Sequence, residues 1–256
     1  MTHFTAKKHL GQHFLRDKNI ARKIVNAISG SPQTLVEIGP GTGVLTALLA
    51  PQYSSLYLVE VDASLAAHLQ QTHPALQERI IVADFLKLPL TKITQGPLTL
   101  IGNFPYNISS QIFFKVLDHR QQVQEVVAMI QQEVAARFVA QPGNKTYGIL
   151  SVLLQAFYEL EYLFSVPPQV FSPPPKVQSA VIRLRRNDTS QLDCDEQLFF
   201  RIVKMGFQQR RKTLRNALKS LLSPALRMAL PLLDQRAEQL SVADYVTLTR
   251  AISMAD

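Results

Sequence analysis

The sequence predicts an α/β fold in which a mostly parallel sheet is followed by a small all-helical region. Short apolar runs alternate with amphipathic stretches from residue 19 to residue 140, and most of these runs are apolar throughout. Beyond residue 188 the apolar residues recur at helical spacing. Fully apolar strands joined by helices are typical of a parallel sheet that is covered on both faces.

The expected elements are separated by polar, glycine or proline residues. Helices are expected at 19–29, 44–49, 64–71, 109–117 and 132–140, and strands at 35–38, 56–61, 80–83, 98–102 and 125–130. Two later apolar runs, 150–158 and 177–184, are expected to form strands that pair antiparallel at one edge, because no full helix separates them.

The C-terminal part of the chain has a different character. Residues 166–175 should form a loop, because five prolines in ten residues exclude a helix and a central strand. A polar linker over 186–196 should lead to a long amphipathic helix over 197–222 and two shorter helices. The last helix is expected to begin at Ser241 with Asp244 as its capping partner. We therefore divide the chain into two domains, 1–188 and 189–256.

Composition limits the class of protein. Apolar residues make up 46% of the chain, and no apolar run approaches the roughly 20 residues that span a bilayer. The N-terminal residues lack the apolar stretch of a secretory signal. A single cysteine, Cys194, excludes a disulfide framework, and the six histidines show no metal-binding spacing. We expect a cytoplasmic protein without a metal, and a monomer by default.

Positive charge is concentrated in two stretches. Residues 7–23 contain six Lys or Arg and one acid, and residues 199–219 contain seven Lys or Arg and no acid. Because the net charge is only +8, this concentration favours a polyanionic partner. The candidate contacts are Lys7, Lys8, Arg16, Arg210, Arg211, Lys212 and Arg215. A solvated helix face and a flexible arm are the alternative interpretation.

A first candidate site follows three of the predicted strands. The turn Gly39-Pro-Gly-Thr-Gly43 lets the backbone approach a ligand, although its G-x-G-x-G spacing is not that of dinucleotide-binding proteins. Glu60 ends the next strand and can accept hydrogen bonds from both hydroxyls of a ribose. Asp84 follows the strand at 80–83 and can accept from an adenine amine. These positions indicate a nucleoside-bearing cofactor, with a tight turn and helix caps as the alternatives.

A second candidate site is Asn103-Phe-Pro-Tyr106, directly after the strand expected at 98–102. The amine of adenine is a poor nucleophile, because its lone pair is delocalised into the ring. The Asn103 side-chain oxygen and a main-chain carbonyl near Phe104 could accept its two N–H groups and favour a pyramidal, more reactive nitrogen. Pro105 would make the turn rigid, and Tyr106 could stack on an extruded base. An ordinary turn is the alternative.

Two further side chains are candidates for these sites. Phe171, in the proline-rich segment, could cover the second face of the base or could pack in the core. His13, in Gly11-Gln-His-Phe-Leu15, could contact the cofactor from the N-terminal arm or could lie on the surface. The sequence leaves both pairs of alternatives open.

Together these motifs resemble those of the small-subunit (16S-type) ribosomal RNA dimethyladenosine transferases. The matching segments are 8–15, 36–41, 59–62, 83–84, 102–106, 171–181 and 207–216. The resemblance covers nearly the whole chain and is specific in combination. His13 departs from it, because Asn is frequent there, and Phe104 stands where Leu or Ile is frequent.

The resemblance implies a class I, Rossmann-like methyltransferase fold with seven strands over 1–188 and a helical RNA-binding domain over 189–256. It implies S-adenosylmethionine as donor and dimethylation of the N6 amines of two adjacent adenosines near the 3′ end of small-subunit rRNA, within a precursor ribosomal particle. The implied cofactor contacts are His13, Leu15, Gly39, Gly41, Glu60, Asp84 and Asn103. Asn103 and Pro105 would serve catalysis, with Tyr106 and Phe171 framing the base.

Three other functions share parts of this pattern. A large-subunit rRNA adenine methyltransferase of the macrolide-resistance type shares the catalytic motifs, but not the basic arm, the Pro-Pro-Pro-Lys loop or the segment 210–215. A non-catalytic nucleic-acid-binding factor on the same fold would not need the glycine turn, Glu60 or the Asn103 motif. A nicotinamide oxidoreductase is the most distant alternative.

Overall fold

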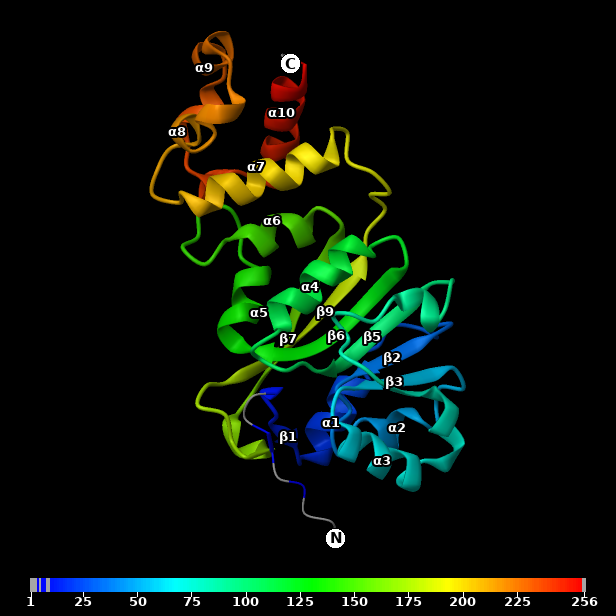
Figure 1. Ribbon diagram of the computed structural model, residues 1–256. Helices are drawn as coiled ribbons and strands as arrows, with labels where there is room; N and C mark the ends of the chain where they lie inside the picture. Colours follow the sequence, from blue (N-terminus) through cyan, green and yellow to red (C-terminus); the bar gives the residue numbers. More distant parts are fainter. Residues whose placement is uncertain (1–3, 5, 8–9, 255–256) are drawn as a thin grey trace. The chain divides into compact units, whose positions relative to one another are not determined.

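The computed structural model describes residues 4, 6–7 and 10–254 (Figure 1). The chain forms two compact units, Met1–Ala135 with Glu161–Arg186 and Ala136–Leu160 with Asn187–Asp256. The chain passes from the first unit to the second for the last time between Arg186 and Asn187, close to the predicted boundary at residue 188. Residues Ala136–Leu160, however, pack with the C-terminal helices, although the sequence analysis placed them in the first domain. The separate roles assigned to 1–188 and 189–256 stay a prediction.

A seven-stranded sheet has the order β4-β3-β2-β5-β6-β9-β7. Its strands are β2 (Leu35–Ile38), β3 (Leu56–Glu60), β4 (Ile80–Val82), β5 (Leu98–Asn103), β6 (Val123–Gln131), β7 (Tyr158–Val166) and β9 (Ser179–Arg186). β2 pairs in parallel with β3 and β5, β3 with β4, and β5 with β6, whereas β9 is antiparallel to β6. The predicted α/β fold with a mostly parallel sheet is confirmed.

The direction in which the chain builds the sheet reverses at β2. The chain first adds β3 and β4 on one side of β2, and then crosses to add β5 and β6 on the other side. In open α/β sheets such a reversal leaves a crevice outside the carboxyl ends of the neighbouring strands. The motifs that follow β2, β3, β4 and β5 are therefore brought to one region.

Five helices lie close to their predicted positions. They are α1 (Lys18–Val25), α2 (Thr46–Leu49), α3 (Ala63–Thr72), α4 (Ser109–Asp118) and α5 (Gln132–Phe138). Asp17 caps α1 and Asp62 caps α3, because their carboxylates accept main-chain N–H groups of the first turn. α1 packs against α2 and β6, and α3 packs against β3 and β4. No helix among the described residues is both long enough and apolar enough to cross a bilayer.

The prediction of a strand at 150–158 is wrong. This run forms α6 (Ile149–Gln155), in which residues 150–154 are all buried. A short, continuous apolar run fits a buried helix as well as a strand, and here the Gly148 N–H donates to Ser151 Oγ at the start of the helix. The edge strand next to β9 is instead β7, which the sequence pattern did not indicate.

The prediction of one long helix at 197–222 is also wrong, because the helix is interrupted. α7 (Glu196–Gln208) ends in a turn, and the chain continues as α8 (Leu214–Ala217). Leu214 returns to pack on Gly206, where an added Cβ would lie 2.9 Å from its side chain. In a continuous helix these residues would be about 12 Å apart along the axis, so the contact of Leu214 with Gly206 requires the break.

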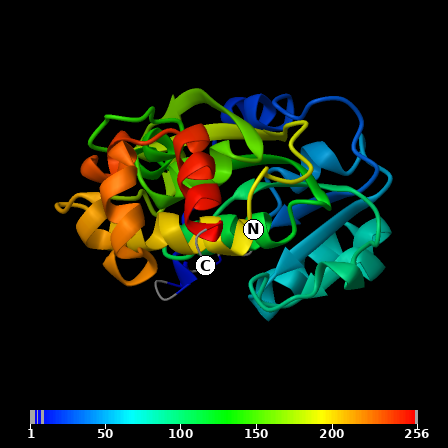
Figure 2. The same ribbon diagram turned by 90° about the horizontal axis from the view of Figure 1, so that it is seen from above.

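The remaining helices agree with the prediction of two short helices. α9 (Pro224–Ala229) is followed by α10 (Val242–Ser253), which lies beside α7 in both views (Figures 1 and 2). Ser241 caps α10 and forms the predicted reciprocal capping box with Asp244.

The proline-rich segment is mostly a loop, as expected, although Pro168–Val170 form one turn of 3-10 helix and the next two residues pair with the N-terminal arm. β8 (Phe171–Ser172) is antiparallel to β1 (Phe14–Leu15). The Arg16 N–H extends this pairing by donating to the Val170 carbonyl at 2.8 Å. The arm is therefore anchored to a segment far along the chain.

Gly102 permits the close approach of β5 to β2. A Cβ at this position would collide with the main-chain oxygen of Ile38. Gly102 directly precedes Asn103, and Ile38 directly precedes Gly39. The contact therefore sets the separation between the two motifs of the predicted site.

Gly102→Ala is expected to destabilise the protein by about 1–3 kcal/mol, because the added methyl group must push β5 away from β2. Urea denaturation measures the change in the free energy of unfolding. Gly96→Ala is the control, since a Cβ there makes only ordinary contacts, the nearest at 3.6 Å. Equal effects of the two substitutions would contradict the argument.

Candidate functional site

A cavity of about 260 Å³ lies at the carboxyl ends of β2, β3, β4 and β5. Its lining residues fall within five segments, 10–15, 37–45, 59–61, 83–86 and 103–108. A volume of this size is near the lower end of small-molecule sites. The structure thus brings the glycine turn, Glu60, Asp84, the Asn103 motif and the N-terminal arm together around one cavity.

The glycine turn lies between the Asn103 motif and the arm. Gly39 and Gly41 have φ angles of +63° and +59°, a region that glycine adopts without strain. An added Cβ at Gly39 would lie 4.0 Å from Pro105 Cδ, and one at Gly41 would lie 3.1 Å from the ring of Phe14. The ring of Phe14 therefore approaches the turn closely at Gly41, whereas Pro105 makes only an ordinary contact at Gly39.

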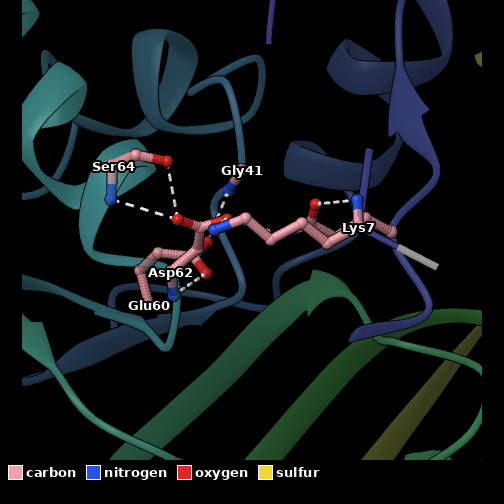
Figure 3. Close-up of polar contacts among 6 residues, drawn as sticks. Lys7, Gly41, Glu60, Asp62 and Ser64 are labelled. Carbon is pink, nitrogen blue, oxygen red and sulfur yellow. Dashed lines mark hydrogen bonds and ion pairs between the residues drawn. The ribbon is translucent and has the colours of Figure 1, made fainter. Parts of the chain in front are cut away.

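Glu60 is 3% exposed, and main-chain N–H groups hold its carboxylate (Figure 3). Oε2 accepts from Gly41 at 3.1 Å, and Oε1 accepts from Asp62 at 2.9 Å. Burial raises the pKa of Glu60, and these two hydrogen bonds oppose the rise. Because a carboxylate can accept about four hydrogen bonds, both oxygens retain capacity for a hydroxyl-bearing ligand.

Lys7 forms an ion pair beside Glu60. Its Nζ lies 2.8 Å from Asp62 Oδ2, while Asp62 Oδ1 accepts the Ser64 N–H at 3.0 Å (Figure 3). Burial disfavours the charged form of Asp62, but the hydrogen bonds from Lys7, Ser64 and Gln12 outweigh it and lower the pKa of this carboxyl. Lys7 thereby ties the N-terminal arm to the cavity, and its predicted RNA contact stays a prediction.

Asn103 has one paired and one unpaired side-chain group. Nδ2 donates to the main-chain oxygen of His13 at 2.7 Å, and because that oxygen can only accept, it sets the orientation of the amide. Oδ1 is buried and has no hydrogen-bond partner among the described residues. A buried acceptor without a partner is costly. Because Asn103 lines the cavity, its unpaired Oδ1 is a candidate acceptor for the N–H group of a ligand.

Tyr106 and His13 stack on each other in the cavity wall, with ring centroids 5.5 Å apart and planes 28° apart. The Tyr106 hydroxyl forms a hydrogen bond with Ser179 Oγ, and His13 Nδ1 donates to the Pro173 carbonyl at 2.8 Å. Burial raises the pKa of Tyr106, and the bond to Ser179 opposes the rise. β9 and the proline-rich segment therefore hold both rings in place.

Asp84 shapes the loop after β4 and also lines the cavity. Its Oδ1 accepts the Leu86 N–H at 2.9 Å, and its main-chain oxygen accepts the N–H groups of Lys87 and Leu88, both at 3.0 Å. The capping role and the ligand role left open for Asp84 are therefore compatible.

Phe171 does not lie in the cavity lining. It is 3% exposed and packs in the hydrophobic core, and β8 pairs it with Leu15. Of the two alternatives left open by the sequence, this arrangement favours core packing over stacking on a base. Leu15 belongs to the same core and also lines the cavity.

Glu37 lines the cavity, although the sequence analysis assigned it no role. It is 1% exposed, and Oε2 accepts the Thr46 hydroxyl at 2.7 Å. Burial raises the pKa of Glu37 to about 8. The charge of Glu60 adds to the rise, and the hydrogen bond from Thr46 opposes it. The available signal was an acid within the apolar run Leu35–Ile38. Buried carboxyls with shifted pKa values are candidates for ligand contact.

The basic residues of the second unit differ in their intramolecular partners. Arg210 donates to the carbonyls of Asn144 and Lys145, and Arg215 pairs with Asp234 at 2.7 Å. These two side chains are therefore already engaged in holding loops of their own unit.

Other predicted RNA contacts are more accessible. Arg211, Lys212 and Arg16 are exposed, and their side chains have no partner among the described residues. Lys8 lies outside the described residues. Of the candidate contacts at 210–215, Arg211 and Lys212 are thus the two whose side chains are exposed and not engaged within the described part of the chain. Over the same described ranges, no three His, Cys, Asp or Glu side chains gather as a metal ion would need.

Glu37→Gln is expected to change the pH dependence of stability. A carboxyl with a pKa of about 8 in the fold, against 4.5 in the unfolded chain, makes the fold less stable as pH rises between those values. The wild-type free energy of unfolding should therefore fall relative to that of Glu37→Gln by up to about 1.4 kcal/mol per pH unit. Urea denaturation at several pH values in this interval measures the difference.

The control is Glu78→Gln, which removes an exposed carboxyl. Its difference from the wild type should not vary over the same pH interval. If the difference in free energy of unfolding between Glu37→Gln and the wild type also did not vary with pH, the raised pKa of Glu37 would be contradicted.

Comparison with known proteins agrees with this geometry. A protein of Cytophaga hutchinsonii named ribosomal RNA small subunit methyltransferase A is 55% identical over 251 residues, which cover 97% of each chain. The crystal structure of a dimethyladenosine transferase from Plasmodium falciparum superposes with a TM-score of 0.78 at 24% identity, over 92% of this chain and 96% of that one. The structure of the 23S rRNA methyltransferase ErmE gives 0.67 at 24% identity, over 92% and 99%.

The two structural likenesses show the fold, and the predicted class I methyltransferase architecture is confirmed. Residues 3–253 match the family described as Ribosomal RNA adenine dimethylase, which is nearly the whole chain. The cavity described above, with its glycine turn, acidic strand end and Asn103 motif, therefore belongs to a member of the ribosomal RNA adenine dimethylase family.

Proposed function

We propose that this chain transfers methyl groups from S-adenosylmethionine to the N6 amines of two adjacent adenosines near the 3′ end of small-subunit rRNA, giving N6-dimethyladenosines during small-subunit biogenesis. One observation carries the proposal: Asn103, whose Oδ1 is buried and has no partner among the described residues, lines the same cavity as the glycine turn and Glu60. A donor site and an acceptor for an exocyclic amine thus share one cavity in a family described by adenine dimethylation.

The donor side of the cavity fits a nucleoside-bearing cofactor. When bound, S-adenosylmethionine supplies a methyl group that its sulfonium has already activated. Glu60 keeps acceptor capacity for ribose hydroxyls, and Asp84 offers a carboxylate to the adenine amine. Gly39 leaves room for close approach, the ring of Phe14 covers Gly41, and His13 and Leu15 close the cavity from the arm.

The acceptor side prepares the target amine. Asn103 Oδ1 accepts one N–H of the amine, and a main-chain carbonyl near Phe104 accepts the other, so that the nitrogen lone pair is less delocalised. Pro105 keeps this turn rigid, and Tyr106 contacts the base. No strong base is needed, because the amine becomes very acidic once it is methylated. Catalysis is therefore mostly positioning of the two reactants.

Asparagine also suits the second methyl transfer. Its side chain is neutral, so its pocket can admit an amine that already carries one methyl group. The amide is oriented by His13 before the substrate arrives, because the Nδ2 hydrogen bond does not involve the substrate. In the second step the amine has one N–H left, and the oriented Oδ1 can accept it.

The RNA partner is assigned to the accessible basic residues. Arg211 and Lys212 are exposed in the second unit, and Arg16 is exposed on the arm. Phosphate contacts of this kind position RNA without reading its sequence. The precursor particle as substrate, the cytoplasmic location and the monomeric state expected from the sequence remain part of this proposal.

Incubation with S-adenosylmethionine and with small or large ribosomal subunits lacking the modification tests the function. Mass mapping should locate dimethyladenosine in small-subunit rRNA with the wild-type protein. Asn103→Ala should reduce the rate at least about 100-fold, because it removes the acceptor for the amine. Its folded state should persist, as judged by circular dichroism.

Asn26→Ala is the matched control, because Asn26 is exposed at the end of α1, and it should retain wild-type activity. Modification of large subunits instead would favour the macrolide-resistance type. Absence of any transfer, with RNA still bound, would favour a non-catalytic factor. Binding of NAD rather than S-adenosylmethionine in calorimetry would favour an oxidoreductase.

The double substitution Arg211→Gln with Lys212→Gln is expected to weaken RNA binding and its salt dependence. Each phosphate contact contributes about 0.7 to 0.9 to the slope of log K against log salt, so the slope should become shallower by about one to two units. Filter binding at several salt concentrations measures it. The control, Lys87→Gln with Lys92→Gln, removes the same charge and should change the slope less. Equal changes of slope in the two double variants would show that Arg211 and Lys212 do not contact the RNA.

A further inference from the structure

Lys115, on α4, has its ammonium group surrounded by main-chain oxygens. Nζ donates to the carbonyls of Phe85, Leu86 and Leu88 at 2.6, 3.2 and 2.5 Å. It also lies 4.9 Å from the centroid of the Phe85 ring, within the range of a cation–π contact. An ammonium has three N–H donors, and three carbonyls of one loop accept them.

This loop is the one that begins at Asp84. Residues 83–86 line the cavity, and Phe85 is only 4% exposed. Asp84 turns the loop, because its carboxylate accepts the Leu86 N–H. Lys115 holds the same turn through its carbonyls.

The helix that carries Lys115 is also attached to the Asn103 motif. α4 follows this motif directly, and the ring of Phe104 packs against Phe113 of α4 with centroids 5.8 Å apart. One helix therefore contacts both the donor loop and the acceptor motif. The acceptor motif therefore anchors the helix whose Lys115 holds the donor loop.

We infer that Lys115 is a positioning residue for the cofactor: by holding three carbonyls it keeps the Asp84 loop in the conformation that binds S-adenosylmethionine. The inference rests on the proposed function, since it assigns the adenosine part of the cofactor to this loop. Lys115 is absent from the cavity lining, so it acts through the loop rather than by touching the cofactor.

The charge of Lys115 and its carbonyl contacts predict opposite effects on binding. The cofactor has a sulfonium, an ammonium and one carboxylate, so removal of a nearby positive charge would by itself strengthen binding. Loss of the carbonyl contacts would weaken it. Lys87 separates the two effects, because it is exposed in the same loop and its side chain has no partner among the described residues.

Calorimetry with S-adenosylmethionine compares Lys115→Met with Lys87→Met. Lys115→Met should raise the cofactor Kd about tenfold, which corresponds to about 1.4 kcal/mol. Its kcat at saturating cofactor should stay close to the wild-type value, because the acceptor motif is intact. Lys87→Met should leave the Kd unchanged or slightly lower it.

Hydrogen exchange provides a second readout without cofactor. The N–H groups of Leu86, Lys87 and Leu88 bond to Asp84, so their exchange reports on the turn. In cofactor-free Lys115→Met they should exchange at least about tenfold faster than in the wild type, and in Lys87→Met at the wild-type rate.

An unchanged Kd for Lys115→Met, or equal changes in the two variants, would overturn the inference. If Lys115→Met does not fold, Lys115→Gln takes its place, because its amide is one atom too short to reach all three carbonyls. It should also weaken binding, and wild-type affinity would again overturn the inference. Failure of the wild type to bind S-adenosylmethionine would instead refute the proposed function, while the exchange of cofactor-free protein still tests the carbonyl contacts.

Discussion

The cavity depends on the close approach of β5 to β2 at the point where the order of the sheet reverses. A glycine at the end of β5 faces the last carbonyl of β2, and no side chain separates the two strands there. The Gly39 turn and Asn103 follow immediately on these strands. The chemistry of two segments about 60 residues apart is thus brought together by a backbone contact that only glycine permits.

The polar groups around the cavity are held before any ligand arrives. Glu60 is fixed by two main-chain N–H groups, Asn103 by the His13 carbonyl, and Glu37 by Thr46. Each is desolvated, and the pKa values of both glutamates are raised by burial. Such groups lower the stability of the ligand-free protein. Their presence together around one cavity is what a preorganised site requires.

Charge in this chain has two different uses. Lys7, Lys115, Arg210 and Arg215 are engaged with carboxylates or carbonyls of the protein itself. Arg211 and Lys212 lie in the turn between α7 and α8 and remain exposed. A basic stretch that looks uniform in the sequence is therefore divided by the fold into structural cations and accessible ones.

The sequence by itself determined the alternation of strands and helices, the turn at Gly39, the Ser241 cap and the motifs that follow each strand, because these depend on local composition and spacing. It did not determine whether residues 150–158 form helix or strand, or where the helix beginning at Glu196 ends, because burial by distant residues decides both. Pairing of the arm with Phe171, the partner of Lys7 and the role of Lys115 likewise required the tertiary structure. These features join residues that are far apart along the chain, and no local pattern records such contacts.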